Sequence, residues 1–289
     1  MEIYSNLRQG EKGAWISIGA YVILSVLKLT IGFLGSSDAL KADGLNNTTD
    51  IIASIAVLIG LRISQRPPDK NHRYGHLRSE TVASLVASFI MAMVGLHVLG
   101  DAIQSFWVPD KEAPSGLTAI VAFFSAIVMY FVYLYNIRLS KRINSTAVKA
   151  AAYDNRSDAW VSIGTSIGIV GAIYGFPIID TVTAFIIGVL IIKTAVDIFK
   201  DSVLTLTDGF DEEMLDTISE TADKVEGVTM VKDVKCRAHG SMIFVDLTVT
   251  MDHTLTVAES HRITEEIEDE ILKINPHSFL QVHTEPDYM

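Results

Sequence analysis

Six stretches of this chain are long and apolar enough, or nearly so, to cross a lipid bilayer, and this pattern limits the fold more than any other feature. A bilayer span needs roughly 20 mostly apolar residues in an α-helix. The second and fifth stretches also contain polar residues, but dropping either would leave an apolar neighbour without a partner. We therefore expect an all-α bundle of six membrane helices, at about residues 14–34, 38–62, 79–105, 115–137, 147–173 and 179–199.

The composition excludes several other classes of protein. Of the 289 residues, 49% are hydrophobic and only 20% are charged, which fits neither an ordinary soluble domain nor a disordered chain. The net charge of −11 argues against a nucleic-acid partner, because a polyanion needs a basic face. The single cysteine, Cys236, cannot form an internal disulfide, a thiolate zinc cluster or a CxxC redox pair. The polar N-terminus lacks the apolar core of a signal peptide.

The charge is unevenly distributed along the chain. Residues 208–289 contain 19 acidic and 6 basic residues, for a net charge of −13, whereas residues 1–207 contain 15 and 17, for a net charge of +2. This shift predicts a six-span transmembrane domain over 1–207 and a small soluble acidic domain over 208–289.

Lysine and arginine in the loops predict the orientation, because cytoplasmic loops are enriched in both. The links at 35–37, 106–114 and 174–178 contain only Lys111. The two remaining links and the N-terminus are basic, so we expect both termini in the cytoplasm. Their basic residues are Arg62, Arg66, Lys70, Arg73 and Arg78, then Arg138, Lys141, Arg142 and Lys149, and Arg8 and Lys12.

The C-terminal region has the pattern of a two-layer α+β domain with the order αββαβ. An acid-rich helix start at Asp211 is followed by β-rich runs at 230–238 and 242–251, with a tight turn expected at 239–241. Thr256 and Glu259 have the spacing of a capping box for a second helix, and a last strand is expected at 279–284. The apolar side of the second helix is predicted to be Val257, Ile263, Ile267, Ile271 and Ile274.

Polar residues inside two of the predicted spans indicate a cation path. Asn46 and Asp50 in the second span, and Asp154 and Asp158 in the fifth, are each four residues apart and so share a helical face. Ionisable groups within a membrane are costly and usually mark an ion or proton pathway. We expect these four side chains to form one metal site, with Asp43 and Asn47 as accessory ligands. The alternative is that they serve helix packing or neutralise Lys41 and Arg156.

The types of ligand in this set narrow the choice of metal. All four side chains offer oxygen, which suits Mn²⁺, Mg²⁺ or Ca²⁺ better than zinc or copper. Metal and protons compete for the same carboxylates, so the site could exchange one for the other.

Three motifs in order make the chain resemble the cation diffusion facilitator family, which comprises proton-coupled exporters of divalent metals. They are ADGLNNTTD at 42–50, DKNHRYGHLRSE at 69–80 and YDNRSDAW at 153–160. The resemblance implies a ferredoxin-like cytoplasmic domain that forms a homodimer. An Asn-x3-Asp pair combined with an Asp-x3-Asp pair looks like the manganese-type branch.

Two further metal sites are expected outside the spans. Asp69, His72 and His76 lie three and four residues apart in a basic loop, and the family binds metal at matching positions. A solvated charged loop is the alternative. The resemblance also implies a regulatory site in the tail, although Lys232 stands where one of that site's histidines is expected. Its remaining residues are Asp246, His261, His283 and Glu285.

The sequence therefore predicts a homodimeric, lipid-embedded antiporter of the cytoplasmic membrane that exchanges Mn²⁺ for protons by alternating access. An exporter of Zn²⁺, Fe²⁺, Co²⁺ or Cd²⁺ is the alternative within the family. A membrane-embedded metalloenzyme is disfavoured because the spans offer no histidine or cysteine set for a catalytic zinc. A passive channel is also disfavoured, because paired buried carboxylates fit alternating access better than a conduction file.

Overall fold

The computed structural model describes residues 2–64, 66–107, 113–143, 146–239 and 242–288. Its contacts divide the chain into two compact units. One contains residues 1–56 and 86–197, and the other contains residues 57–85 and 198–289.

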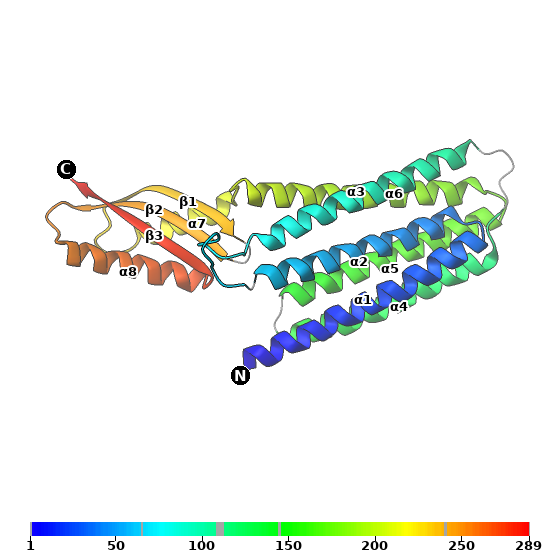
Figure 1. The fold of residues 1–289 in the computed structure, drawn as a ribbon, viewed down its shortest axis with the longest axis horizontal. Coiled ribbons are helices and arrows are strands. Elements are labelled where there is room, and N and C mark those ends of the chain that lie inside the picture. The colour runs from blue at the N-terminus through cyan, green and yellow to red at the C-terminus, as the bar shows by residue number, and fades with distance from the viewer. Residues whose placement is uncertain (1, 65, 108–112, 144–145, 240–241, 289) are drawn as a thin grey trace. The chain divides into compact units, whose positions relative to one another are not determined.

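Six long helices make up the first 206 residues (Figure 1). They match the six predicted spans, although α1, α4 and α6 are longer. Within the described residues, α1, α3, α4 and α6 are long and apolar enough to cross a membrane. The polar side chains of α2 and α5 lower their hydropathy, although both helices are also long. The bounds are Glu2–Leu34 for α1, Asp38–Ser64 for α2, Ser79–Phe106 for α3, Gly116–Ile143 for α4, Thr146–Ile173 for α5 and Ile178–Leu206 for α6.

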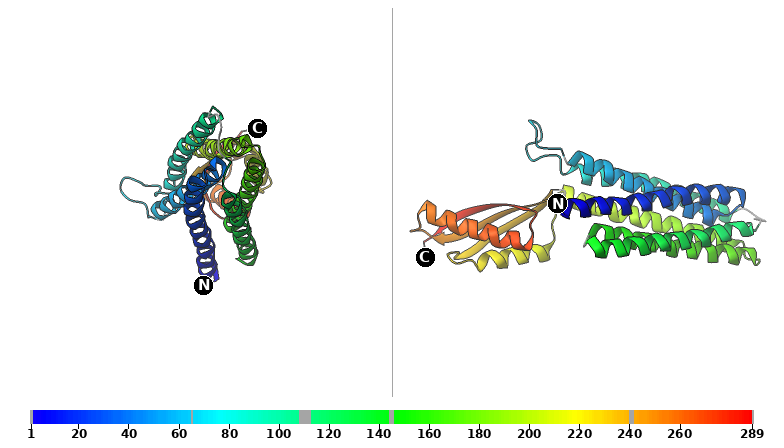
Figure 2. Two further views of the ribbon diagram at one scale, coloured as in Figure 1. Left: turned by 90° about the vertical axis from the view of Figure 1, so that its right-hand side faces the viewer. Right: turned by 90° about the horizontal axis from the view of Figure 1, so that it is seen from below.

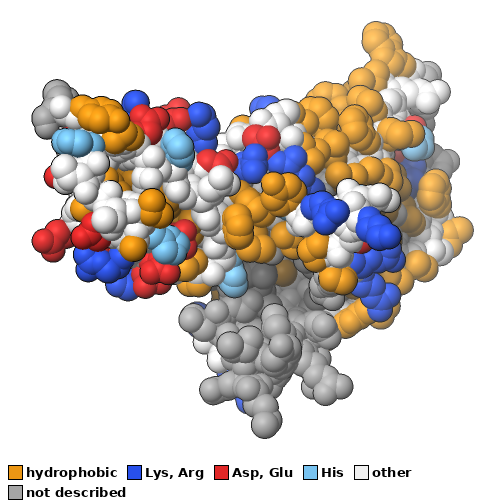
Figure 3. All heavy atoms as spheres, turned by 60° about the vertical axis from the view of Figure 1, so that its left-hand side comes forward, with side chains coloured by type: hydrophobic (Ala, Val, Ile, Leu, Met, Phe, Trp, Pro, Cys, Tyr) orange, Lys and Arg blue, Asp and Glu red, His pale blue; other side chains and the backbone are white. Residues whose placement is uncertain are grey.

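Small apolar side chains bring these helices close together. Ala42 of α2 packs with Ala102 of α3 and Ala184 of α6, while Ala159 of α5 packs with Met129 of α4 and Leu24 of α1. The opposite sides of the helices are apolar and exposed, as at Phe33, Met93 and Phe131, and Figure 3 shows hydrophobic side chains covering much of the visible helix surface. Such an extended apolar surface fits contact with lipid.

The start of α2 is fixed by a carboxylate from α6. Asp180 accepts hydrogen bonds from the Ser37 hydroxyl at 2.7 Å and from the backbone N–H of Asp38 at 2.6 Å. A helix N-terminus has unsatisfied N–H donors and a partial positive charge, so a buried carboxylate is stabilising there. This cap sets the position at which the polar face of α2 begins.

The C-terminal domain has the predicted αββαβ order. It comprises α7 (Glu212–Asp223), β1 (Met230–His239), β2 (Met242–Asp252), α8 (Val257–Ile274) and β3 (Ser278–Asp287). The strand order is β1-β2-β3, with β1 antiparallel and β3 parallel to β2. Both helices lie against one face of the sheet (Figure 2). The ferredoxin-like α+β prediction is confirmed.

Local signals explain where these elements begin. The Asp211 side chain accepts from the Glu213 N–H at the start of α7, and Thr256 and Glu259 form the predicted capping box of α8. Ile263, Ile267 and Ile271 are buried as expected. Val257 and Ile274 are exposed, because they are the first and last residues of α8. The expected turn at 239–241 falls partly on residues 240–241, which lie outside the described residues.

Candidate metal-binding sites

The two predicted i,i+4 pairs meet between α2 and α5, where Asn46 contacts Asp158. The Asn46 amide nitrogen donates to Oδ1 of Asp158 at 3.2 Å and to Oδ2 of Asp50 at 3.4 Å. Asp158 is 8% exposed, and Asn46 and Asp50 are half-buried. The structure thus brings three of the four predicted ligands together, from α2 and α5.

Asp154 occupies a different environment from these three side chains. It lies one helical turn before Asp158 in α5, and its side chain is exposed. A cation at this cluster would require Asn46 to turn its amide oxygen toward it, because the amide nitrogen cannot bind a cation.

A tyrosine from α1 completes the cluster. The Tyr21 hydroxyl lies 2.6 Å from Oδ2 of Asp158 and 3.0 Å from Oδ1 of Asn155, so one hydroxyl proton serves two acceptors. The shorter distance, to the carboxylate, marks the stronger bond. Asp158 therefore receives a donor on each oxygen, Asn46 on one and Tyr21 on the other.

A second polar cluster surrounds Lys28, which is fully buried in α1. Its ammonium nitrogen lies 2.9 Å from Oδ1 of Asp43, 2.7 Å from Oδ1 of Asn47 and 2.9 Å from the Ser162 hydroxyl. The two residues that we expected as accessory ligands, Asp43 and Asn47, are thus both engaged by a lysine.

The spacing of polar residues in α1 is a sequence signal that points to Tyr21 and Lys28. Tyr21, Ser25 and Lys28 are spaced four and three residues apart in an otherwise apolar helix, so they share one face. Ser25 on this face bonds to Thr48 of α2 at 2.6 Å. A lysine in an apolar span is a functional hypothesis by default, with an acidic partner to be sought.

Neither of the bases that could have neutralised the acidic cluster does so in the described interactions. Lys41 pairs with Asp38 at 2.6 Å. Arg156 lies over the rings of Tyr153 and Tyr133, at 4.7 and 5.9 Å from their centroids. Among the described interactions, Lys41 and Arg156 therefore do not pair with Asp50 or Asp158.

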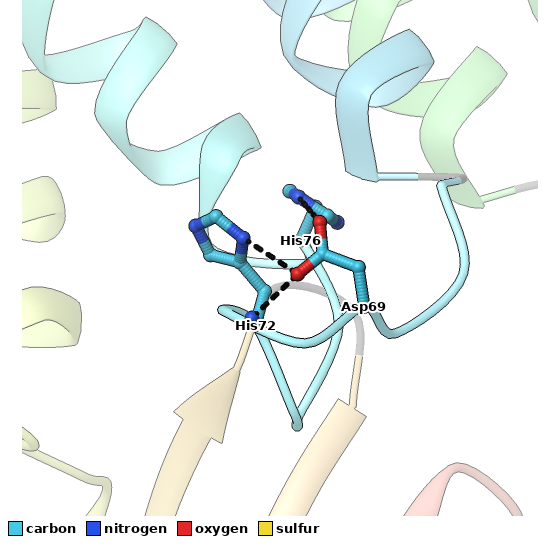
Figure 4. Close-up of side chains that lie close together, drawn as sticks. All are labelled: Asp69, His72 and His76. Carbon is cyan, nitrogen blue, oxygen red and sulfur yellow. Dashed lines mark hydrogen bonds and ion pairs between the residues drawn. The ribbon is translucent and has the colours of Figure 1, made fainter.

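The three predicted loop ligands converge (Figure 4). Among the described residues they form a group whose ligand atoms all lie within 4.8 Å of one another. Asp69 lies 3.2 Å from Nδ1 of His72 and 3.6 Å from Nε2 of His76, and Figure 4 shows both imidazoles turned toward its carboxylate. One carboxylate and two imidazoles are a suitable ligand set for a divalent ion.

The loop backbone keeps Asp69 ionised. The N–H groups of His72 and Asn71 donate to Asp69 Oδ1 at 2.7 and 2.8 Å. These hydrogen bonds hold the pKa of Asp69 below its usual range. A ligand that is already deprotonated loses nothing to proton competition when a metal binds.

The loop also contacts the C-terminal domain, within the same compact unit. The Tyr74 ring packs edge-on against Phe244 of β2 with centroids 5.7 Å apart, and Arg78 forms an ion pair with Asp208. Gly75 has a φ of +80° and its N–H donates to the carbonyl oxygen of His72, so a glycine here allows the tight turn at residues 72–75. The position of the loop ligands is therefore tied to the sheet.

The four predicted tail ligands do not converge in one protomer. Asp246, His283 and Glu285 lie on the sheet face opposite α7 and α8, because alternate residues such as Leu247 and Val249 are buried under the helices. His261 lies on α8, 3.6 Å from Glu265. A site containing all four residues would need a second protomer or a rearrangement.

Glu285 is already paired within the protomer. Lys232 is the extra residue at a β-bulge in β1, and its ammonium nitrogen lies 2.6 Å from Oε2 of Glu285. This bond holds the pKa of Glu285 below its usual range. Lys232 is thus paired with the carboxylate of Glu285, which the predicted tail site requires as a ligand.

Comparison with known proteins places this arrangement in a family. Residues 14–207 match the cation efflux transmembrane domain, and residues 210–287 match the cation efflux protein cytoplasmic domain. The manganese efflux system protein MneS of Bacillus subtilis (strain 168) is 54% identical over 286 residues, which cover 99% of each chain. The manganese efflux system protein MneP of the same organism is 31% identical over 268 residues, which cover 90% of each chain.

Part of the chain is also similar to solved structures. A structure of the MamM CTD is 26% identical, with a TM-score of 0.25, and the match covers 27% of this chain and 100% of that one. The matches to both family domains together span nearly the whole chain. The chain therefore belongs to the cation efflux, or cation diffusion facilitator, family on its manganese-type branch, and it is a multi-pass metal efflux transporter of the cell membrane and not an enzyme.

Proposed function

We propose that this transporter exports Mn²⁺ from the cytoplasm in exchange for protons. The observation that carries the proposal is the linked cluster of Asn46, Asp50 and Asp158, with Asp154 one turn away. The similarity to MneS, which is named as a manganese efflux protein, supports the choice of ion.

The chemistry of the cluster favours manganese over zinc. Carboxylate and amide oxygens are hard ligands that suit Mn²⁺, whereas zinc prefers imidazole or thiolate. Three histidines approach a carboxylate in the first part of the chain. His72 and His76 lie in the loop beside Asp69, and His97 lies on α3 beside Asp101, so none of them belongs to this cluster. Export of Zn²⁺, Fe²⁺, Co²⁺ or Cd²⁺ is the alternative that the transport assay below distinguishes.

Proton coupling follows from the same carboxylates. Asp50 and Asp158 bind metal only when deprotonated, so protons arriving from outside displace the ion and refill the site. Alternating access then requires the helices to open the cluster to one side at a time. In this cycle the donors Asn46 and Tyr21 satisfy Asp158 while no metal is bound.

The topology belongs to the same proposal. A transmembrane domain over 1–207 and a cytoplasmic domain over 208–289, with both termini in the cytoplasm, place the basic loop and the acidic tail on the loading side. The negative charge of the tail attracts divalent cations toward that side. We assign dimerisation to the cytoplasmic domain together with helix contacts.

The loop and the tail are proposed as accessory metal sites. The convergence of Asp69, His72 and His76 supports the loop site. The tail site, from Asp246, His261, His283 and Glu285, is proposed to form between protomers and to regulate transport. A metal ion that binds Glu285 at this tail site has to displace Lys232 from the carboxylate.

Transport by the purified protein in vesicles tests the proposal. Mn²⁺, Zn²⁺, Fe²⁺ and Co²⁺ are compared under an imposed pH gradient, with internal pH recorded during uptake. We expect Mn²⁺ to be transported fastest and its movement to drive protons in the opposite direction. Metal flux without proton movement would contradict antiport, and faster Zn²⁺ flux would contradict the choice of ion.

A further inference from the structure

Lys28 uses all the hydrogen-bonding capacity of its ammonium group. A lysine ammonium has three N–H donors, and three acceptors surround it, on Asp43, Asn47 and Ser162, at 2.7 to 2.9 Å. The side chains of Lys28 and Asp43 are 0% and 1% exposed. A buried charge persists only when it is paired and hydrogen-bonded in this way.

The partners of Lys28 retain unused polar atoms. Oδ2 of Asp43 and Nδ2 of Asn47 are buried and make no hydrogen bond with any residue that the structure describes. Ser162 also donates to Oδ1 of Asp43, at 3.3 Å. Asp43 is therefore a buried carboxylate that is paired with Lys28 through one oxygen and whose second oxygen has no hydrogen-bond partner among the described residues.

The Lys28 cluster is the next polar layer beside the proposed transport site. Asn47 directly follows Asn46 in α2, and Ser162 lies one turn beyond Asp158 in α5. Lys28 itself lies two turns beyond Tyr21 in α1. One helical turn rises about 5.4 Å, so the two layers are close enough for their charges to interact.

We propose that Lys28 is a built-in counter-cation that keeps Asp43 and Asn47 out of metal binding. Its ammonium occupies the position that a second divalent ion would otherwise take. The charge that attracts Mn²⁺ is then set by Asp50, Asp154 and Asp158, and the helices hold one ion per chain. Lys28 does not touch the transported ion; it acts as a positioning residue because it holds the side chains of Asp43 and Asn47. The inference rests on the proposed function, because it assigns the neighbouring cluster to transport.

Two variants distinguish a role of Asp43 in balancing the charge of Lys28 from a role as a metal ligand. In an Asp43→Asn variant the Lys28 charge is no longer balanced, and it repels Mn²⁺ from the adjacent site. In a Lys28→Met/Asp43→Asn variant both charges are absent, and the repulsion disappears with them. If Asp43 were a ligand, the double variant would be as weak as the single one.

The test measures Mn²⁺ binding to the full-length protein in nanodiscs, with free Mn²⁺ followed by electron paramagnetic resonance. The binding step that disappears in Asp50→Ala identifies the helix site and separates it from the loop and the tail. We expect Asp43→Asn to weaken that step about tenfold or more. The double variant should bind within about threefold of the original protein.

Two outcomes would overturn the proposal. One is a double variant that binds as weakly as Asp43→Asn, and the other is an Asp43→Asn variant that binds like the original protein. If Asp43→Asn does not fold, Lys28→Met alone decides, because the freed Asp43 should bind one additional Mn²⁺ per chain, and an unchanged number of ions would contradict the proposal. Retention of every binding step in Asp50→Ala would instead contradict the proposed function.

Discussion

The hydroxyl of Tyr21 lies 2.6 Å from Oδ2 of Asp158, and this buried hydrogen bond links α1 to α5. The other oxygen of the same carboxylate accepts from Asn46 of α2. Asp158 is thus held by donors from two other helices. When an ion binds to one oxygen, the second can keep its bond to the tyrosine. Such outer-shell bonds orient a ligand and tune its affinity for metal.

Removal of this hydroxyl should therefore weaken transport without removing a ligand. In Tyr21→Phe we expect the Mn²⁺ concentration for half-maximal transport to rise about tenfold, which is the usual size of an outer-shell effect. Vesicle uptake at a series of Mn²⁺ concentrations measures it. Tyr130→Phe is the matched control, because Tyr130 is 48% exposed on α4, and it should transport normally. An unchanged Tyr21→Phe would show that Asp158 needs no support from α1.

Asn46 should determine the choice of ion, because it is the single neutral ligand in the cluster. Asn46→His adds a borderline-soft imidazole, which should raise the ratio of Zn²⁺ to Mn²⁺ transport several-fold. Competition between the two ions in the same vesicles measures the ratio. Ile59→His, at an exposed position of the same helix, is the control and should produce no zinc preference. An unchanged ratio in Asn46→His would place selectivity outside the cluster.

The close approach of α5 and α6 gives a prediction about packing. A methyl group at Gly168 would collide with the Thr183 side chain, whereas one at Gly164 would meet nothing within 4 Å. Gly168→Ala should therefore lower the unfolding temperature, and Gly164→Ala should leave it unchanged or raise it slightly, because alanine favours helix. Thermal unfolding in detergent compares the two variants. Equal stability would mean that the helices are not packed as closely as the structure shows.

The helices and the tail topology could be read from the sequence, but the partners of the buried groups could not. Spacing of four residues predicted the shared faces of Asn46 with Asp50 and of Asp154 with Asp158. It could not show that Tyr21 and Lys28 face these residues, because the rotation of α1 depends on packing against α4 and α5. Similarly, the strand pattern predicted the sheet, but it could not show that His261 and His283 lie on opposite sides of that sheet.

The Lys232–Glu285 pair should control metal binding by the tail. Lys232→His removes the competing charge from Glu285 and adds an imidazole, so the full-length protein should bind metal at the tail more tightly. Metal titration of the purified protein measures the change. Lys224→His, at a residue exposed at the end of α7, is the control. Equal affinity in Lys232→His and the original protein would argue against a tail site at Glu285.

The same pair predicts a direction for the pH dependence of stability. Lys232 lowers the folded-state pKa of Glu285, so its contribution is present above the unfolded pKa and is lost as the pH falls through the lower, folded value. Acid unfolding of Lys232→Met should therefore depend less on pH in that range than unfolding of the original protein, because methionine removes the charge that is paired with Glu285.

Proton movement driven by Mn²⁺ in vesicles that contain the original protein, Asp158→Asn or Asp50→Ala tests the assignment of the transport site most directly. Asp158→Asn keeps the size of the side chain and can still hydrogen-bond, but it has no charge to offer to a metal or a proton. We expect Mn²⁺ to drive protons across the membrane with the original protein, and neither ion to move with either variant while both variants remain folded. Mn²⁺–proton exchange at the original rate in Asp158→Asn or Asp50→Ala would contradict the central assignment.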